Sequence, residues 1–137
     1  MQVDKILNNL YLSRLNLKNY FLDLLDPLRV KIYLSAMVFV NILIWSLCKF
    51  IVSRIGAEQM ALHYNVDFGI DYYGNVGNVY IIPLLGLVII SVNFYLFAFA
   101  SRFKDKIFIT HLLFSSAIFA NIILLASAIS VYLVNFK

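Results

Sequence analysis

Three long stretches without Asp, Glu, Lys or Arg constrain this chain more than any other feature. They cover residues 32–48, 72–101 and 107–136. A helix rises about 1.5 Å per residue and the hydrocarbon core of a bilayer is about 30 Å thick, so roughly 20 apolar residues cross it. The last two stretches reach that length, and the first reaches it if the Lys49 ammonium extends to the interface. The pattern predicts three membrane-spanning helices.

The composition also favours a membrane protein over a soluble domain. Only 13% of the 137 residues are charged, whereas soluble domains carry about 25%. The single cysteine, Cys48, excludes an intrachain disulfide and a cysteine metal cluster. The chain has no P-loop, GxGxxG, HExxH or GxSxG motif. We therefore predict no cofactor, no nucleic-acid partner and no enzymatic activity, with the lipid bilayer as the surrounding partner.

Residues 1–25 have the period of an amphipathic helix when the chain advances about 100° per residue. The apolar side contains Val3, Ile6, Leu7, Leu10, Leu17, Phe21, Leu24 and Leu25. Lys5, Arg14 and Lys18 lie beside this side, which suits an anionic membrane surface. Packing against the protein's own spans or a partner subunit fits the pattern equally well.

The amphipathic segment and the three uncharged stretches together predict an all-α membrane protein. Residues 1–25 form a cytoplasmic or interfacial amphipathic helix, and residues 26–137 form a three-span membrane domain. The spans are expected at about 30–52, 79–101 and 107–134, with an outer loop at 53–78. The short RFKDK connection allows only a tight turn, so the second and third spans should form an antiparallel hairpin.

The distribution of lysine and arginine predicts the orientation, because these residues are enriched on the cytoplasmic side. One side of the membrane would carry Lys5, Arg14, Lys18, Arg29, Lys31, Arg102, Lys104 and Lys106. We expect this side to be cytoplasmic. The N-terminus then lies in the cytoplasm, and both the 53–78 loop and the C-terminus lie outside.

Three asparagines, Asn41, Asn93 and Asn121, lie inside the predicted spans. A carboxamide that faces lipid would leave donors and acceptors unpaired at a cost of about several kcal/mol. We therefore expect all three side chains to make polar contacts between helices. His111 is the ionisable group nearest to the membrane interior, one turn inside the third span, which disfavours ion-coupled transport by this chain alone.

The third span also contains small residues four positions apart. Ser116 and Ala120 form one such pair, and Ala126 and Ser130 form the other. This spacing lets helix backbones approach closely. It predicts packing against the second span or against a membrane-protein partner, including another copy of the chain.

The polar sequence at residues 62–74, LHYNVDFGIDYYG, is the main candidate for a functional site. Its glycines and asparagines favour turns, so we expect a folded loop rather than a continuous helix. The candidate structural or recognition residues are His63, Tyr64, Asn65, Asp67, Gly69, Asp71 and Gly74. The aromatic residues suit headgroup depth, where they would cap the helix ends. His63, Asp67 and Asp71, spaced four apart, are weak candidates for a metal site.

The order and spacing of several residues here resemble a known family. The matching positions are Leu62, His63, Tyr64, Asn65, Gly69, Ile70, Asp71, Gly74 and Pro83. This pattern is similar to the outer-loop signature of the bacterial SdpI-type membrane proteins and their short relatives. Gln59 to Ala61 and Ile70 depart from it, because the family usually places a proline near each of these positions. The resemblance implies a multi-pass protein of the bacterial inner (plasma) membrane, and the family's activities need additional spans.

Three functional hypotheses follow from these features. The first is a small non-enzymatic integral membrane protein whose outer aromatic loop recognises a peptide, a protein or a lipid. The second is an accessory or structural subunit of a larger membrane complex. The third, a metal-dependent membrane enzyme, requires His63, Asp67 and Asp71 to converge.

Overall fold

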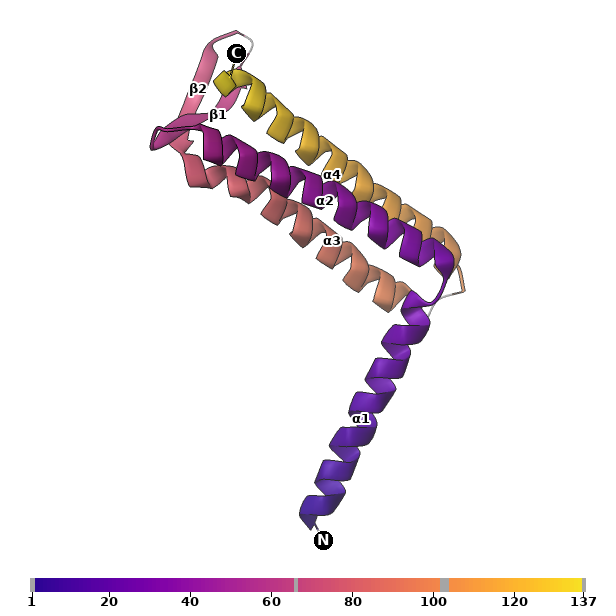
Figure 1. The fold of residues 1–137 in the computed structure, drawn as a ribbon. Helices are drawn as coiled ribbons and strands as arrows, with labels where there is room; N and C mark the ends of the chain where they lie inside the picture. Colours follow the sequence, from indigo (N-terminus) through magenta and orange to yellow (C-terminus); the bar gives the residue numbers. More distant parts are fainter. Residues whose placement is uncertain (1, 66, 102–103, 137) are drawn as a thin grey trace.

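The computed structural model describes residues 2–65, 67–101 and 104–136, with side chains from residue 12 onward except Leu17. Most of the described chain is helical. The elements are α1 (Gln2–Leu25), α2 (Leu28–Arg54), β1 (Gln59–Asn65), β2 (Gly69–Asn75), the 3₁₀ helix η1 (Val76–Tyr80), α3 (Ile81–Ala100) and α4 (Lys106–Phe136). Figure 1 shows α2, α3 and α4 side by side, with α1 projecting from one end and the two strands at the other.

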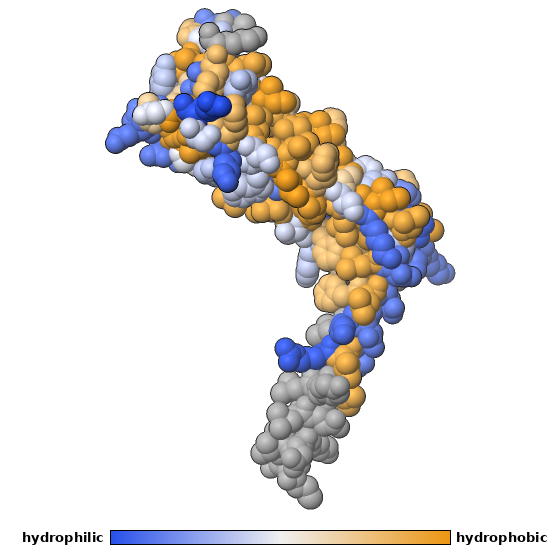
Figure 2. Space-filling model, in the orientation of Figure 1, coloured by the Kyte–Doolittle hydropathy of each residue, from blue (hydrophilic) through white to orange (hydrophobic). Residues whose placement is uncertain are grey.

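Three helical segments within the described residues are long and apolar enough to cross a membrane. They are Leu28–Arg54, Val76–Ala100, which includes η1, and Lys106–Phe136. This part of the prediction is confirmed. The helices α2, α3 and α4 alternate in direction (Figure 1), as expected for the pair α3 and α4. On the face drawn in Figure 2, apolar side chains cover the middle of the bundle and hydrophilic ones gather towards its ends.

The segment between α2 and α3 corrects the all-helical expectation, because it forms an antiparallel β-hairpin. Register runs from Gln59 opposite Asn75 to Asn65 opposite Gly69, with irregularities around His63. Met60 and Ala61, at the base of the hairpin, are both buried. Two consecutive residues of β1 are therefore buried, and the register irregularities lie further along the strand, between Ala61 and Tyr64. Both features remove the alternation expected of a half-buried strand.

The bundle interior consists of two apolar clusters. The cluster near the hairpin contains Ile44, Cys48, Ile51, Met60, Val76, Val79, Ala128 and Val131. The cluster near α1 contains Leu24, Val30, Met37, Ile90, Phe97, Phe114 and Ala117. Each cluster draws residues from α2 and α4, so these two helices are packed together along their length.

A polar contact lies between the two clusters and joins all three long helices. The Asn41 Nδ2 group donates to the Pro83 carbonyl oxygen at 3.1 Å and to Asn121 Oδ1 at 3.2 Å. Asn121 Nδ2 donates to the Ala117 carbonyl at 3.0 Å. Asn41 is 3% exposed and Asn121 is fully buried. They occupy the middle positions of α2 and α4, which corresponds to the centre of a bilayer.

Asn93 does not take part in this contact. Its Nδ2 group donates to the Ile89 carbonyl, 2.9 Å away and one turn earlier in α3. A carboxamide on a helix can satisfy its donor locally in this way, because the carbonyl four residues earlier lies on the same face. The helix–helix contact expected at Asn93 is therefore replaced by a bond within its own helix.

The end of η1 is stabilised by α2. Pro83 has no N–H, so it cannot donate to the carbonyl of Val79 as a residue four positions later normally does. That carbonyl accepts from the Ile81 N–H and, at 3.7 Å, from the Cys48 thiol of α2. Cys48 and Val79 are both buried. This contact places the irregular backbone before α3 against α2 rather than against lipid.

Among the side chains of α1 that the structure describes, those near its end pack on the bundle. The Tyr20 hydroxyl donates to the Ala98 carbonyl of α3 at 2.7 Å, and Leu24 joins an apolar cluster. Phe21 and Leu22 are 44% and 55% exposed. The predicted apolar side lies largely among residues 2–11 and 17, whose side chains are outside the described set. In the turns of α1 whose side chains are described, the membrane-spanning helices cover only part of the predicted apolar side.

A substitution at Gly86 tests the central contact. A Cβ atom at this position would overlap Asn41 Nδ2 and Asn121 Oδ1. Gly86→Ala should therefore lower the free energy of unfolding by about 1–3 kcal/mol, despite the higher helix propensity of alanine. Unfolding by sodium dodecyl sulfate in mixed micelles measures this change.

The matched control is Gly56→Ala, because a Cβ at Gly56 meets nothing within 4 Å. Stability should be retained in that variant. Equal stability of Gly86→Ala and the wild type would show that the three helices do not approach each other as closely as described.

Candidate functional site

The turn of the β-hairpin is shaped by residues that the sequence analysis selected. The Asn65 side chain accepts a hydrogen bond from the Asp67 N–H at 2.9 Å, which closes a short turn. Gly69 has a φ of +76°, a conformation that glycine adopts at little cost. At Gly74, a Cβ atom would overlap the end of the Leu62 side chain, so glycine fits this position. Asn65, Gly69 and Gly74 therefore determine the shape of the hairpin.

His63 and Asp71 pair across the two strands. The distance between His63 Nδ1 and Asp71 Oδ1 is 2.6 Å, and the side chains are 65% and 39% exposed. An ionised carboxylate only accepts, so Nδ1 carries the proton and Nε2 remains available to solvent or a ligand. An exposed pair of this kind contributes at most about 1 kcal/mol. Its main effect is to orient the imidazole.

The three weak metal candidates are not brought together. His63 is paired with Asp71, whereas Asp67 lies in the turn, where its N–H donates to Asn65. Within the described residues, no group of three His, Cys, Asp or Glu side chains could hold a metal ion. The donor set therefore does not fit a metal centre, and the structure offers no geometry for metal-dependent chemistry here.

Asn135 attaches the hairpin to α4. Its Oδ1 accepts from the Ala61 N–H at 3.0 Å, and its Nδ2 donates to the Ala61 carbonyl at 2.7 Å. The carboxamide thus binds both polar groups of one residue in β1. Asn135 was not among the predicted polar contacts. It is an asparagine one residue before the end of a long apolar helix, so the requirement for a hydrogen-bond partner that applies to the other span asparagines applies to it as well.

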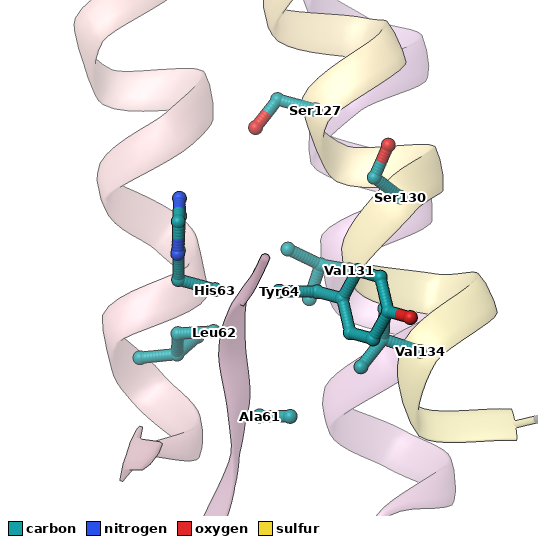
Figure 3. Close-up of a pocket in the computed structure, with 8 residues that line it drawn as sticks. All are labelled: Ala61, Leu62, His63, Tyr64, Ser127, Ser130, Val131 and Val134. Carbon is teal, nitrogen blue, oxygen red and sulfur yellow. The ribbon is translucent and has the colours of Figure 1, made fainter. Parts of the chain in front are cut away.

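A cavity of about 290 Å³ lies between β1 and the outer part of α4. It is lined by Ala61, Leu62, His63, Tyr64, Ser127, Ser130, Val131 and Val134. Figure 3 shows the two serines on α4 and the Tyr64 ring beside Val131 and Val134. The Ser130 hydroxyl donates to the Ala126 carbonyl, whereas the Ser127 hydroxyl makes no hydrogen bond with the described residues. The lining combines apolar surface with a few hydrogen-bonding groups, as ligand sites do.

The depth of this cavity follows from the helix geometry. Ser127 and Ser130 lie six and nine residues beyond Asn121 in α4, or about 9–14 Å along the axis. If Asn121 marks the bilayer centre, the cavity lies just inside the edge of the hydrocarbon core, about 15 Å from that centre. Its position is therefore the boundary between acyl chains and headgroups.

The outer surface of the hairpin is rich in exposed aromatic side chains. Phe68 is 84% exposed, and Tyr64, Tyr72 and Tyr73 are between 51% and 58% exposed. Phe68 lies at the turn, and the two later tyrosines lie in β2. Aromatic residues are enriched where proteins bind partners and at membrane interfaces. This surface is unusually apolar for a segment that also carries two aspartates.

Comparison of the chain with models of known protein families, with curated proteins and with solved structures finds no match in any of the three. The geometry of the hairpin and its cavity therefore carries the functional argument.

The hydrogen bonds of Asn135 give a direct test of how the hairpin is held. Asn135→Leu keeps the side-chain size but removes two hydrogen bonds, each worth about 1 kcal/mol. Backbone amides of β1 should then exchange with deuterium roughly tenfold to thirtyfold faster, because the hairpin opens more often. Hydrogen exchange measured by mass spectrometry reports this change.

Asn93→Leu serves as the matched control, since Asn93 bonds only to its own helix. Exchange in β1 should stay at the wild-type rate in that variant. Wild-type exchange in Asn135→Leu would mean that the apolar base of the hairpin suffices to hold it.

Proposed function

We propose that this chain is a small non-enzymatic integral membrane protein that recognises a partner at the outer membrane surface through its β-hairpin. The partner is a peptide, a protein or a lipid that approaches the aromatic surface and the cavity beneath it. The proposal includes a bacterial inner membrane location, with the N-terminus in the cytoplasm and the C-terminus outside.

The observation that supports this proposal most directly is a fixed base beneath an exposed aromatic surface. Met60 is buried in the apolar cluster, and Asn135 binds both backbone groups of Ala61. Only a few residues away, Phe68 and Tyr73 are 84% and 58% exposed. A surface that is already ordered loses little conformational entropy on binding, so its aromatic groups contribute more of their contact energy to affinity.

The direction of the chain in the membrane is supported by charge. The end of the bundle that carries α1 has Arg14, Lys18, Arg29, Lys31, Lys104 and Lys106 among its described residues. The hairpin carries Asp67 and Asp71 with no lysine or arginine of its own. Lysine and arginine accumulate on the cytoplasmic side, which supports an outer location for the hairpin.

A second candidate function is that of an accessory subunit, and one observation favours it. Ser116, Ala126 and Ser130 are exposed on α4, so these small residues do not face α2 or α3. They leave a surface of α4 on which another transmembrane helix can pack closely. That helix would belong to a membrane-protein partner or to another copy of the chain.

Site-directed photo-crosslinking tests the recognition surface. A benzophenone-bearing amino acid at Phe68 should yield a discrete adduct in native membranes, because a bound partner lies within reach of the turn. Tyr73→Ala in the same background should weaken that adduct. Mass spectrometry of the adduct identifies a peptide, a protein or a lipid.

The control places the same amino acid at Phe39, which is 62% exposed on α2 near mid-membrane. No discrete protein adduct is expected there under the recognition hypothesis. An adduct at Phe39 without one at Phe68 would reject recognition by the hairpin.

A further inference from the structure

A second cavity, of about 100 Å³, lies at the opposite end of the bundle, where four helices meet. Its lining comes from the ends of α1 and α3 and from the beginnings of α2 and α4. The residues that carry its chemistry are Asp23, Arg29, Ser101, Lys106 and Thr110. The volume equals roughly three water molecules of the liquid. The cavity therefore suits one small polar group rather than a whole molecule.

Two cations in this lining have no partner within the described chain. Arg29 and Lys106 are both exposed, and neither side chain makes a salt bridge or hydrogen bond with a described residue. Lys31 differs, because its ammonium lies 3.3 Å from Asp26. Among the described residues of the lining, Asp23 is the one carboxylate, so these residues together carry a net charge of about +1 at neutral pH. The charge balance favours an anion.

The hydroxyl groups of the cavity do not compete for this role. Thr110 Oγ1 donates to the Lys106 carbonyl, and Ser101 Oγ donates to the Ala98 carbonyl. Their protons are therefore engaged within the helices. The helix dipoles also offset one another, since two helices begin and two end at this point. Arg29 and Lys106 therefore provide the attraction for a ligand. Their positive charges favour an anionic ligand over a neutral ligand that can only form hydrogen bonds.

The position of the two cations matches lipid headgroups. Arg29 lies twelve residues before Asn41 in α2, and Lys106 lies fifteen residues before Asn121 in α4. These separations correspond to about 18 and 22 Å along the helix axes. The headgroup region extends from about 15 to 22 Å from the bilayer centre. A lipid phosphate in this leaflet therefore lies at the depth of the cavity.

Apolar side chains next to both cations favour a lipid over a free phosphate ion. Leu28 precedes Arg29, and Phe108 lies two residues after Lys106. They are 72% and 70% exposed. Both side chains lie at headgroup depth, and Phe108 is about 3 Å nearer the bilayer centre than Lys106. These apolar groups can contact the glycerol and upper-chain region of a lipid whose phosphate enters the cavity, a contact that a free ion cannot make.

From these observations we propose that the cavity beside Arg29 and Lys106 binds the phosphate group of an anionic phospholipid. The site is independent of the outer hairpin and lies at the other membrane surface. It fixes a lipid at the junction of α1 with the bundle, where α1 otherwise has few contacts. Arg29 and Lys106 provide the attraction, and Asp23 opposes it.

Native mass spectrometry of the whole protein tests the site. The protein is released from micelles that contain equal amounts of dioleoyl phosphatidylglycerol and dioleoyl phosphatidylcholine, and the ratio of the two bound lipids is measured. The wild type should favour phosphatidylglycerol. Arg29→Gln and Lys106→Gln should each reduce that preference about fivefold. One basic residue near an anionic membrane surface contributes about 1 kcal/mol to binding, which corresponds to a factor of about five in the binding constant.

Asp23→Asn gives a change of opposite sign, because it removes the opposing carboxylate, and should raise the preference. Lys104→Gln is the matched control for general surface charge, since Lys104 lies at the same end without lining the cavity. It should leave the ratio near the wild-type value. All four side chains are polar and outside the apolar clusters, so the variants should fold.

Three outcomes would overturn the proposal. Equal losses in Arg29→Gln, Lys106→Gln and Lys104→Gln would indicate non-specific charge attraction. A wild type without preference for phosphatidylglycerol would remove the site. Thermal stabilisation by inorganic phosphate that matches the effect of phosphatidylglycerol, at equal ionic strength, would assign the cavity to a free ion instead of a lipid.

Discussion

The arrangement of this protein depends on one buried polar contact, in which Asn41 of α2 binds Asn121 of α4 and the Pro83 carbonyl of α3. An unpaired carboxamide in hydrocarbon costs about several kcal/mol, whereas a paired one in a membrane contributes on average only about 0.6 kcal/mol. The contact therefore determines how the three helices are positioned relative to one another, and it adds little to the free energy of unfolding. Sliding one helix by a turn would separate the partners. Gly86 completes the selection, because any larger residue would occupy the space of the two side chains.

The height of α3 relative to α2 determines where the hairpin lies. With the Pro83 carbonyl held by Asn41, the preceding η1 segment is placed beside α2, where Cys48 donates to the Val79 carbonyl. Backbone that is not α-helical is tolerated at this depth because protein rather than lipid covers it. The hairpin then begins against the ends of α2 and α4, and Asn135 binds Ala61. A contact in the middle of the three long helices thus positions the hairpin at one end of the bundle.

The sequence predicts the helices far better than the hairpin, for physical reasons. Long uncharged stretches report membrane spans directly, since a charge inside the hydrocarbon is costly. The strands lack an alternating pattern: Met60 and Ala61 are both buried, whereas β2 is exposed on both faces from Ile70 to Tyr73. The spacing of four along His63, Asp67 and Asp71 would place them on one face only in a continuous helix, which the glycines of this segment disfavour. In the structure the partner of His63 is Asp71, across the hairpin. Pairing across strands follows the turn, not a helical period.

The two ends of the bundle offer different chemistry at similar distances from its centre. The cavity at the hairpin has serine hydroxyls, a tyrosine and a histidine whose Nδ1 is already engaged by Asp71. The cavity at the α1 end has two cations, Arg29 and Lys106, that pair with no other side chain in the described part of the chain. An anion gains little from the first and much from the second. Under the two proposals, the site at the hairpin would select by shape, aromatic contact and hydrogen bonding, and the site at the α1 end would select by charge. Because Asn41 and Asn121 fix the helices along the membrane normal, both sites keep their depth in the bilayer when either one is occupied, so their occupancies should be independent unless the helices themselves move.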